Sequence, residues 1–282
     1  MQVSILRDLA LVVAGNNLIE GQTVRRFWPD YEIFRYSKEC VFIDKDHSVI
    51  APDPNEWLAR IQKDFDGLWL DYSDRNKWVG DRMTVGFVGG GHRWLIGAVK
   101  GDTTELWEGG DELGDRKAPD RKIWKSGYVR LEADWKQKRD PGRSVADMKA
   151  VLDDTLRKIG AFAREQKRDN FAESFEAARD ALIGRPMRDP MFDNGEMSRE
   201  ARQLLQAIGS AWVFGGMGSW NDIGFENEKD NQAYETLSNT LYEQLNEAVA
   251  AVANSTWPKY KMPPKEGTTW WQRLFTKLPP TT

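Results

Sequence analysis

The chain of 282 residues is poor in the side chains that most often carry chemistry. It contains one cysteine, Cys40, which excludes an intrachain disulfide and a cysteine-cluster zinc site. Cys40 lies in an apolar, strand-like run, and this context predicts a buried, unreactive thiol. His47 and His92 are the only histidines in the sequence, so histidine-rich metal sites and most hydrolase triads have few candidate members.

Long apolar runs and an excess of positive charge are also missing. No window approaches the roughly 18 apolar residues that a membrane span requires. The apolar stretch 9–13 is too short for the core of a secretory signal peptide, and Asp8 interrupts it. The formal net charge of −4 gives no general attraction to nucleic acid or to anionic membranes. We therefore expect a cytoplasmic protein that neither spans a membrane nor binds nucleic acid.

The chain up to residue 140 is rich in β-type patterns. One helix is expected among them, because Asp53 can cap it, Pro54 suits its first position and Glu56 its third. A glycine turn at 89–92 joins two apolar runs and predicts a hairpin. The region 1–140 is thus predicted to be a mainly antiparallel sheet with one or two packed helices, its strands at 31–36, 40–43, 67–72, 83–88, 93–99, 103–107 and 122–132.

After residue 140 the apolar residues recur at the spacing of an α-helix. Ser144 and Ser198 are positioned as N-caps of two helices, and apolar stripes at 171–182 and 234–252 mark two more. Region 141–256 is therefore predicted to hold four helices, and the fold class is α+β.

Residues 257–282 form a proline-rich, basic and aromatic tail with a charge of +4, which leaves −8 for the rest of the chain. One interpretation is a strap whose aromatic residues pack on the acidic body. The other is a segment that docks on a partner or on a membrane surface.

The segment 215–222 reads Gly-Gly-Met-Gly-Ser-Trp-Asn-Asp and lies between two predicted helices. Three glycines in four positions predict a reversal with positive φ angles, closed by Ser219, Asn221 or Asp222. The alternative is a nest of backbone N–H groups that binds an anion. The segment has no Lys or Arg and acidic neighbours follow it, which favours the structural interpretation.

This segment, together with Asn231, Leu237, Leu241 and Tyr242 on the next helix, resembles a motif of a family of small uncharacterised bacterial proteins. In that family a GGMGS-aromatic-ND run joins two helices. The resemblance covers about residues 198–253 and implies no activity and no cofactor. It does imply kinship with proteins found near toxin and immunity genes.

The 13 tryptophans of the chain fall into two predicted groups. Trp57, Trp69, Trp94 and Trp212 occupy inward positions of periodic segments and are expected in the core. Other tryptophans lie in or beside polar loops. Trp78, Trp107 and Trp220 have acidic neighbours, as aromatic anchors of protein interfaces often do, and are our predicted partner-binding residues.

No arrangement of residues in the sequence predicts a catalytic centre, a metal site or a cofactor site with any specificity. We therefore predict a protein-binding protein, specifically an immunity-type inhibitor of a basic bacterial toxin, because opposite charges speed association. The alternative is a metal-dependent hydrolase or nuclease that uses the carboxylates near Asp44, Asp46 and His47, since carboxylate oxygens and imidazole nitrogens bind divalent metals. The oligomeric state is not predicted.

Overall fold

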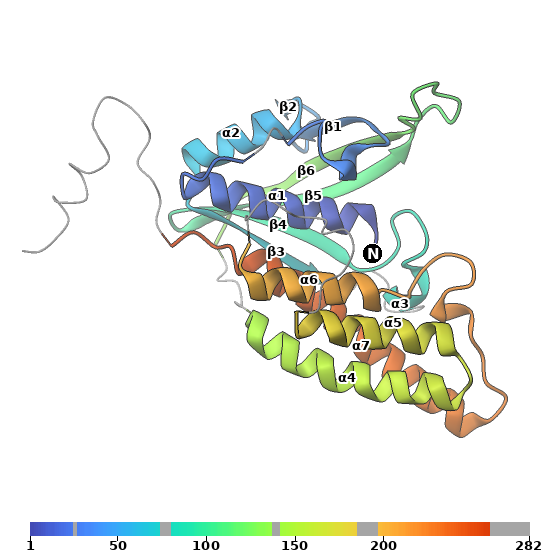
Figure 1. Cartoon of the computed structure of the whole chain (residues 1–282). Helices are drawn as coiled ribbons and strands as arrows, with labels where there is room; N and C mark the ends of the chain where they lie inside the picture. The colour runs from blue at the N-terminus through green and yellow to red at the C-terminus, as the bar shows by residue number, and fades with distance from the viewer. Residues whose placement is uncertain (25–26, 74–79, 137–141, 185–196, 260–282) are drawn as a thin grey trace, which may run out of the picture.

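The computed structural model describes residues 1–24, 27–73, 80–136, 142–184 and 197–259. A six-stranded sheet lies at one end of the molecule and a group of long helices at the other (Figure 1). This arrangement confirms the α+β class with a helical region in the C-terminal half.

The sheet is mixed, not purely antiparallel. Its strand order is β2-β1-β6-β5-β4-β3, and every pair is antiparallel except β1 with β6, which is parallel. A hairpin cannot join parallel strands, so packing between distant parts of the chain sets this pairing. The strands are β1 (Ser37–Ile43), β2 (Val49–Ala51), β3 (Gly67–Ser73), β4 (Arg93–Lys100), β5 (Thr103–Leu113) and β6 (Trp124–Trp135).

Two of the predicted strands are wrong. Residues 31–36 contain the 3₁₀ turn η1 (Glu32–Phe34), in which the buried Phe34 ring packs edge-on against Phe27 at 5.3 Å. Residues 83–88 contain the end of the short helix α3 (Asp81–Thr84) and the turn after it, and β4 pairs with β3 and β5 instead. The hairpin predicted at 89–92 is therefore also wrong. The glycines at 89–91 serve a tight turn after α3 and not a hairpin, because a Cβ on Gly90 would lie 1.9 Å from the Thr84 carbonyl oxygen.

The N-terminal helix α1 (Val3–Ile19) was not predicted, although it fills the centre of the fold. It packs against β3, α7 (Glu228–Asn254) and α2 (Pro54–Asp64), and most of its residues are buried. A helix buried on all sides carries no polar face, so its sequence lacks an amphipathic pattern. Helix α2 begins as predicted, with the Asp53 carboxylate accepting hydrogen bonds from the first-turn N–H groups.

The four predicted C-terminal helices are confirmed. Ser144 caps α4 (Val145–Glu165) and Ser198 caps α6 (Arg199–Ala211), each accepting a hydrogen bond from a backbone N–H of the first turn. Helix α5 (Asp169–Leu182) lies between them in sequence. Helix α7 begins before its apolar stripe, because Asn227 caps it. No described helix is long and apolar enough to cross a membrane.

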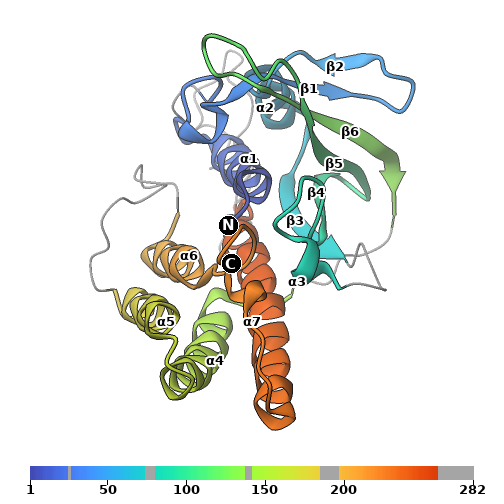
Figure 2. The same cartoon turned by 90° about the vertical axis from the view of Figure 1, so that its right-hand side faces the viewer.

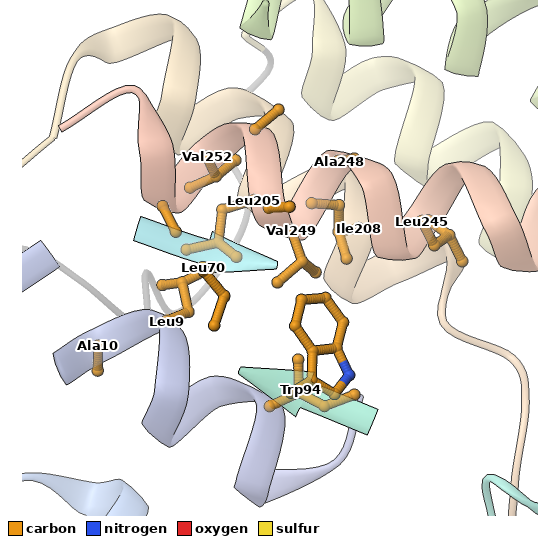
Figure 3. Close-up of a cluster of buried hydrophobic side chains, with 14 of the residues drawn as sticks. Leu9, Ala10, Leu70, Trp94, Leu205, Ile208, Leu245, Ala248, Val249 and Val252 are labelled. Atoms are coloured by element: carbon orange, nitrogen blue, oxygen red, sulfur yellow. The ribbon is translucent and has the colours of Figure 1, made fainter. Parts of the chain in front are cut away.

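One hydrophobic cluster joins the sheet to the helical region. Figure 3 shows Trp94 of β4 and Leu70 of β3 facing Leu205 of α6 and Val249 of α7, with Leu9 of α1 beside them. All five side chains are buried. The sheet and the helical region therefore share one hydrophobic core.

Two asparagines close the outer edge of strand β3. The side chain of Asn16 donates to the Leu68 carbonyl at 2.9 Å and accepts from the Leu68 N–H at 2.7 Å. Asn254 makes the same pair of bonds with Leu70, both at 2.9 Å. An open strand edge can recruit another strand, and these side chains occupy the groups that would do so.

A buried polar network connects α1 to the sheet. The Arg7 guanidinium pairs with Asp111 at 2.9 Å, and the Tyr128 hydroxyl donates to Asp8 at 2.5 Å. Burial raises the pKa of Asp8 to about 7, although the positive charge of Arg7 acts in the opposite direction. Below about pH 7 the protonated form of Asp8 is therefore favoured in the folded protein.

Candidate functional site

Two glycine-containing loops meet where the sheet joins the helices. The first is the 80–92 segment between β3 and β4, and the second, residues 212–222 after α6, is called the glycine loop below. Figure 1 shows α3 of the 80–92 segment next to the glycine loop. A Cβ on Gly86 would lie 2.9 Å from the Gly216 nitrogen, and one on Gly215 would lie 2.9 Å from the Gly86 Cα. The two backbones are thus in direct contact, which only glycine permits at this distance.

The glycine loop is closed by its own polar groups. Gly215 and Gly216 both have φ of 86°, and Gly218 has φ of 76°, as the sequence predicts. The Asp222 carboxylate accepts hydrogen bonds from the N–H groups of Gly218 at 2.6 Å and Ser219 at 3.1 Å. Because a carboxylate of the chain already occupies these N–H groups, the geometry favours a structural reversal over an anion nest.

Arg82 ties the two loops to helix α7. Its guanidinium donates to Asn239 at 2.8 Å, to Asn221 at 2.7 Å and to Glu235 at 2.6 Å. Asn221 in turn donates to the Arg82 carbonyl at 2.8 Å. The Arg82 side chain is 4% exposed and lies over the ring of Tyr234 at 5.6 Å. An arginine with three side-chain acceptors fixes the positions of the elements that supply them.

His92 forms a second tie, between the 80–92 segment and helix α7. Its Nδ1 lies 2.9 Å from the Asp81 carboxylate and its Nε2 lies 3.1 Å from the Glu243 carboxylate, which belongs to α7. Burial lowers the pKa of His92, but the hydrogen bonds and charges of Glu243 and Asp81 outweigh burial, so the pKa lies above its usual value. The ring is 1% exposed, so it serves to join the loop to α7 and does not face solvent.

The tips of the two loops expose apolar side chains. Phe87 is 72% exposed, Val88 is 67% exposed and Met217 is fully exposed, and the nearby Met83 is also exposed. These four residues are called the two-loop surface below. Gly86 directly precedes Phe87 and contacts Gly215 and Gly216, which directly precede Met217, so the contact between the loops brings the tips to the same region. Exposed apolar side chains that gather in one place mark interaction sites, whereas single exposed ones are common on any surface.

Acidic residues follow the glycine loop along the chain. The stretch 222–235 contains five carboxylates against a single lysine, Lys229. Glu235 bonds to Arg82, yet its side chain is 47% exposed, and Glu243 on the same helix is 54% exposed. The exposed carboxylates of Glu235 and Glu243 therefore lie next to Arg82 and His92, at the base of the two-loop surface.

The predicted partner-binding tryptophans do not form this surface. Trp107 is fully buried, packed edge-on against Phe42 at 5.8 Å and against Trp57 at 5.9 Å. Trp220 is also fully buried, and its indole N–H donates to Ser238 at 2.7 Å. Their predicted exposure on loops is wrong, because both rings are needed to fill the core. Trp78 lies outside the described residues.

The sequence contains a signal for the exposed tips. Phe87 and Val88 are bracketed by glycines at 86 and 89, and Met217 is bracketed by Gly216 and Gly218. Met217 belongs to no helical or strand periodicity, and the glycines at 86 and 89 leave Phe87 and Val88 as a pair too short for the strand predicted at 83–88. No helix or strand carries these side chains into the core, so the sequence indicates that they are exposed.

The residues of the alternative metal site are engaged in a turn. Asp44 forms an ion pair with Arg130, and Asp46 accepts bonds from the Ser48 N–H at 2.9 Å and hydroxyl at 2.6 Å. These hydrogen bonds, from Arg130 to Asp44 and from Ser48 to Asp46, lower the pKa of each carboxyl. His47 has a φ of 66° at the tip of the turn. Among the described residues, no group of three or more His, Cys, Asp and Glu side chains is arranged to hold a metal ion.

No protein-family model, curated protein or solved structure matches the chain.

Proposed function

We propose that the protein binds a protein partner through the two-loop surface. The observation that carries the proposal is the exposure of Phe87, Val88 and Met217 on loops whose bases are fixed by buried side chains. Burying apolar side chains at an interface is favourable, and large side chains at its centre supply most of the binding energy.

Rigidity of the loops supports this proposal. Arg82 and His92 each bond to side chains from more than one element, and Gly86 contacts the glycine loop directly. A loop that is already fixed loses little conformational entropy when it binds, so less of the contact energy is spent on ordering it. The hydrogen bonds of Arg82 and His92 therefore fix the positions of the loops that carry the exposed tips.

Charge indicates what kind of partner would bind. The stretch 222–235 carries five carboxylates, and the whole chain has a net charge of −4. A partner with lysines and arginines around an apolar patch would be attracted electrostatically and would bury the tips. We infer an immunity-type role, namely inhibition of a basic bacterial toxin, and the resemblance of residues 198–253 to proteins found near toxin and immunity genes supports it.

The test uses the product of the gene next to the one that encodes this chain. Binding of that protein to the wild type and to the variants Phe87→Ser and Met217→Ser is measured by calorimetry. Loss of a central anchor typically costs at least about 2 kcal/mol, or roughly 30-fold in affinity. Val49→Ser is the matched control, because Val49 is 63% exposed on β2 and belongs to the sheet.

Two results would refute parts of the proposal separately. If the partner binds both loop variants as tightly as the wild type, the two-loop surface is not the interface. If the neighbouring protein does not bind the wild type at all, the toxin-inhibitor role fails.

A further inference from the structure

The His92 ring lies between two carboxylates that belong to different elements. Its Nδ1 is 2.9 Å from Asp81 of α3, and its Nε2 is 3.1 Å from Glu243 of α7. Figure 2 shows α3 beside α7, so the ring lies where the 80–92 segment meets this helix. Tyr72 of β3 and Tyr242 of α7 pack against the ring, with centroids 4.9 Å and 5.0 Å away. These contacts hold the imidazole between the two carboxylates.

The number of protons on the ring decides how many of these contacts are hydrogen bonds. A protonated imidazole carries an N–H on both nitrogens, whereas a neutral one carries a single N–H and a lone pair. Protonated His92 can therefore donate to Asp81 and Glu243 at the same time. Neutral His92 can donate to one of them, and its other nitrogen then directs a lone pair at a carboxylate oxygen.

Burial decides which of the two hydrogen bonds is lost. The Asp81 side chain is 2% exposed, whereas the Glu243 side chain is 54% exposed. Water can replace the hydrogen bond to Glu243, but a buried carboxylate that loses a donor is left at a high cost in free energy. The proton of neutral His92 therefore stays on Nδ1, and the contact between Nε2 and Glu243 becomes repulsive.

The other charged and titratable groups next to the ring keep their charge while His92 titrates. The Arg82 guanidinium donates to three other side chains, and Arg93 pairs with Glu108 at 2.7 Å. Burial raises the pKa of Tyr242, so its hydroxyl stays neutral in the range where histidine titrates. The proton on His92 therefore governs the contact with Glu243.

The same histidine closes the base of the loop that carries the exposed tips. Asp81 and His92 are 11 positions apart and bond to each other, and Phe87 lies between them in the chain. The bond from Nε2 to Glu243 connects this closed loop to α7. Arg82 also joins the loop to α7, so loss of the bond to Glu243 loosens the loop without detaching it.

We propose that His92 is a proton-dependent latch between the 80–92 segment and helix α7. When the ring is protonated, Glu243 is bound and the segment is fixed. When the ring loses a proton, Glu243 turns to solvent and the segment loosens. The effect on partner binding rests on the proposed function, because a looser two-loop surface loses more conformational entropy when it binds. The latch itself needs no partner.

Nitrogen NMR of isotope-labelled histidine rings in the full chain tests the proton count. The chain contains two histidines, and His92→Gln assigns their signals. We expect both ring nitrogens of His92 to be protonated at low pH, and Nε2 to lose its proton as pH rises. The transition should lie above pH 6.5, because the pKa of His92 is raised from that value. Loss of the proton from Nδ1 in place of Nε2 would overturn the proposal.

Hydrogen exchange of residues 80–92, followed by mass spectrometry, tests the loosening. The wild type and Glu243→Gln are compared at one pH below the His92 transition and at one pH above it. A glutamine amide can accept from a protonated ring and donate to a neutral one, so this variant keeps the contact at both pH values. The sequence of the segment is the same in both proteins. We expect equal exchange below the transition and several-fold faster exchange in the wild type above it.

The matched control is Glu247→Gln. Glu247 lies one turn further along α7 and pairs with Arg143 at 3.3 Å, so this variant should show the exchange of the wild type at both pH values. Equal exchange in the wild type and Glu243→Gln above the transition would overturn the latch. Neither measurement uses a partner, so failure of the latch and failure of the proposed function are distinguishable.

Discussion

The contact between Gly86 and the glycine loop allows a quantitative test with three alanine substitutions. Gly216 has a φ of 86° and open space around its added Cβ, so Gly216→Ala introduces backbone strain alone. Gly86 lacks a positive φ, but its Cβ would lie 2.9 Å from the Gly216 nitrogen, so Gly86→Ala introduces a steric clash alone. Gly215 has both a φ of 86° and a Cβ position 2.9 Å from the Gly86 Cα.

The expected losses follow from these two costs. A left-handed conformation costs an L-residue about 1–2 kcal/mol, which is the expected loss for Gly216→Ala. Overpacking costs about 1–3 kcal/mol, which is the expected loss for Gly86→Ala. Gly215→Ala combines both costs and should lose about 2–5 kcal/mol. Alanine also lowers the conformational entropy of the unfolded chain, which stabilises every variant by about 0.4–1 kcal/mol and offsets part of these losses.

Urea denaturation monitored by tryptophan fluorescence measures the free energy of unfolding of each variant. Gly224→Ala is the control for the effect on the unfolded chain, because Gly224 lacks a positive φ and its Cβ would meet open space. Gly224→Ala should be neutral or slightly stabilising. Equal losses for Gly215→Ala and Gly216→Ala would show that the contact with Gly86 carries no energy. A stable Gly216→Ala variant would contradict the positive φ.

Four further predictions concern the core, the sheet edge and pH. Trp107→Ala and Trp220→Ala should each lower the free energy of unfolding by about 3–5 kcal/mol, because each truncates a buried aromatic side chain. A thermal melt unchanged from wild type would mean that the ring is not buried. Asn16→Ala and Asn254→Ala should each lower the free energy of unfolding by about 1–3 kcal/mol in urea denaturation, because backbone N–H and C=O groups of β3 lose their hydrogen-bond partners. Asn231→Ala, on the exposed side of α7, is the control and should be nearly neutral. The raised pKa of Asp8 means that this carboxyl holds its proton more tightly in the folded state than in the unfolded state. The free energy of unfolding should therefore fall as pH rises from 3.8 to about 7, and Asp8→Asn should flatten this slope. The pKa of His92 is raised from 6.5, so the contribution of the protonated ring to the free energy of unfolding should be present below pH 6.5 and lost as pH rises further. If the pH dependence of the free energy of unfolding is the same for His92→Gln and the wild type above pH 6.5, that contribution is refuted.

The candidate site could be predicted from the sequence in part. The positive φ angles of the glycine loop and the capping roles of Ser144 and Ser198 were predicted, because backbone sterics and caps act over a few neighbouring residues. The partners of Arg82 and His92 were not predicted. Arg82 and Asn221 are separated by 139 positions, and His92 and Glu243 by 151, so local pattern says nothing of their contact.

Local chemistry by itself determined the α+β class, the amphipathic helices of the C-terminal half and most of the strands, since each follows from periodicity within one segment. Tertiary structure decided what the sequence pattern left open or misread. It paired β1 in parallel with β6 and made the apolar segment 3–19 a central helix. It also buried Trp107 and Trp220, whose sequence neighbours are acidic. The physical reason is the same in each case: burial depends on which distant elements fold over a residue, and a residue's sequence neighbours do not encode that.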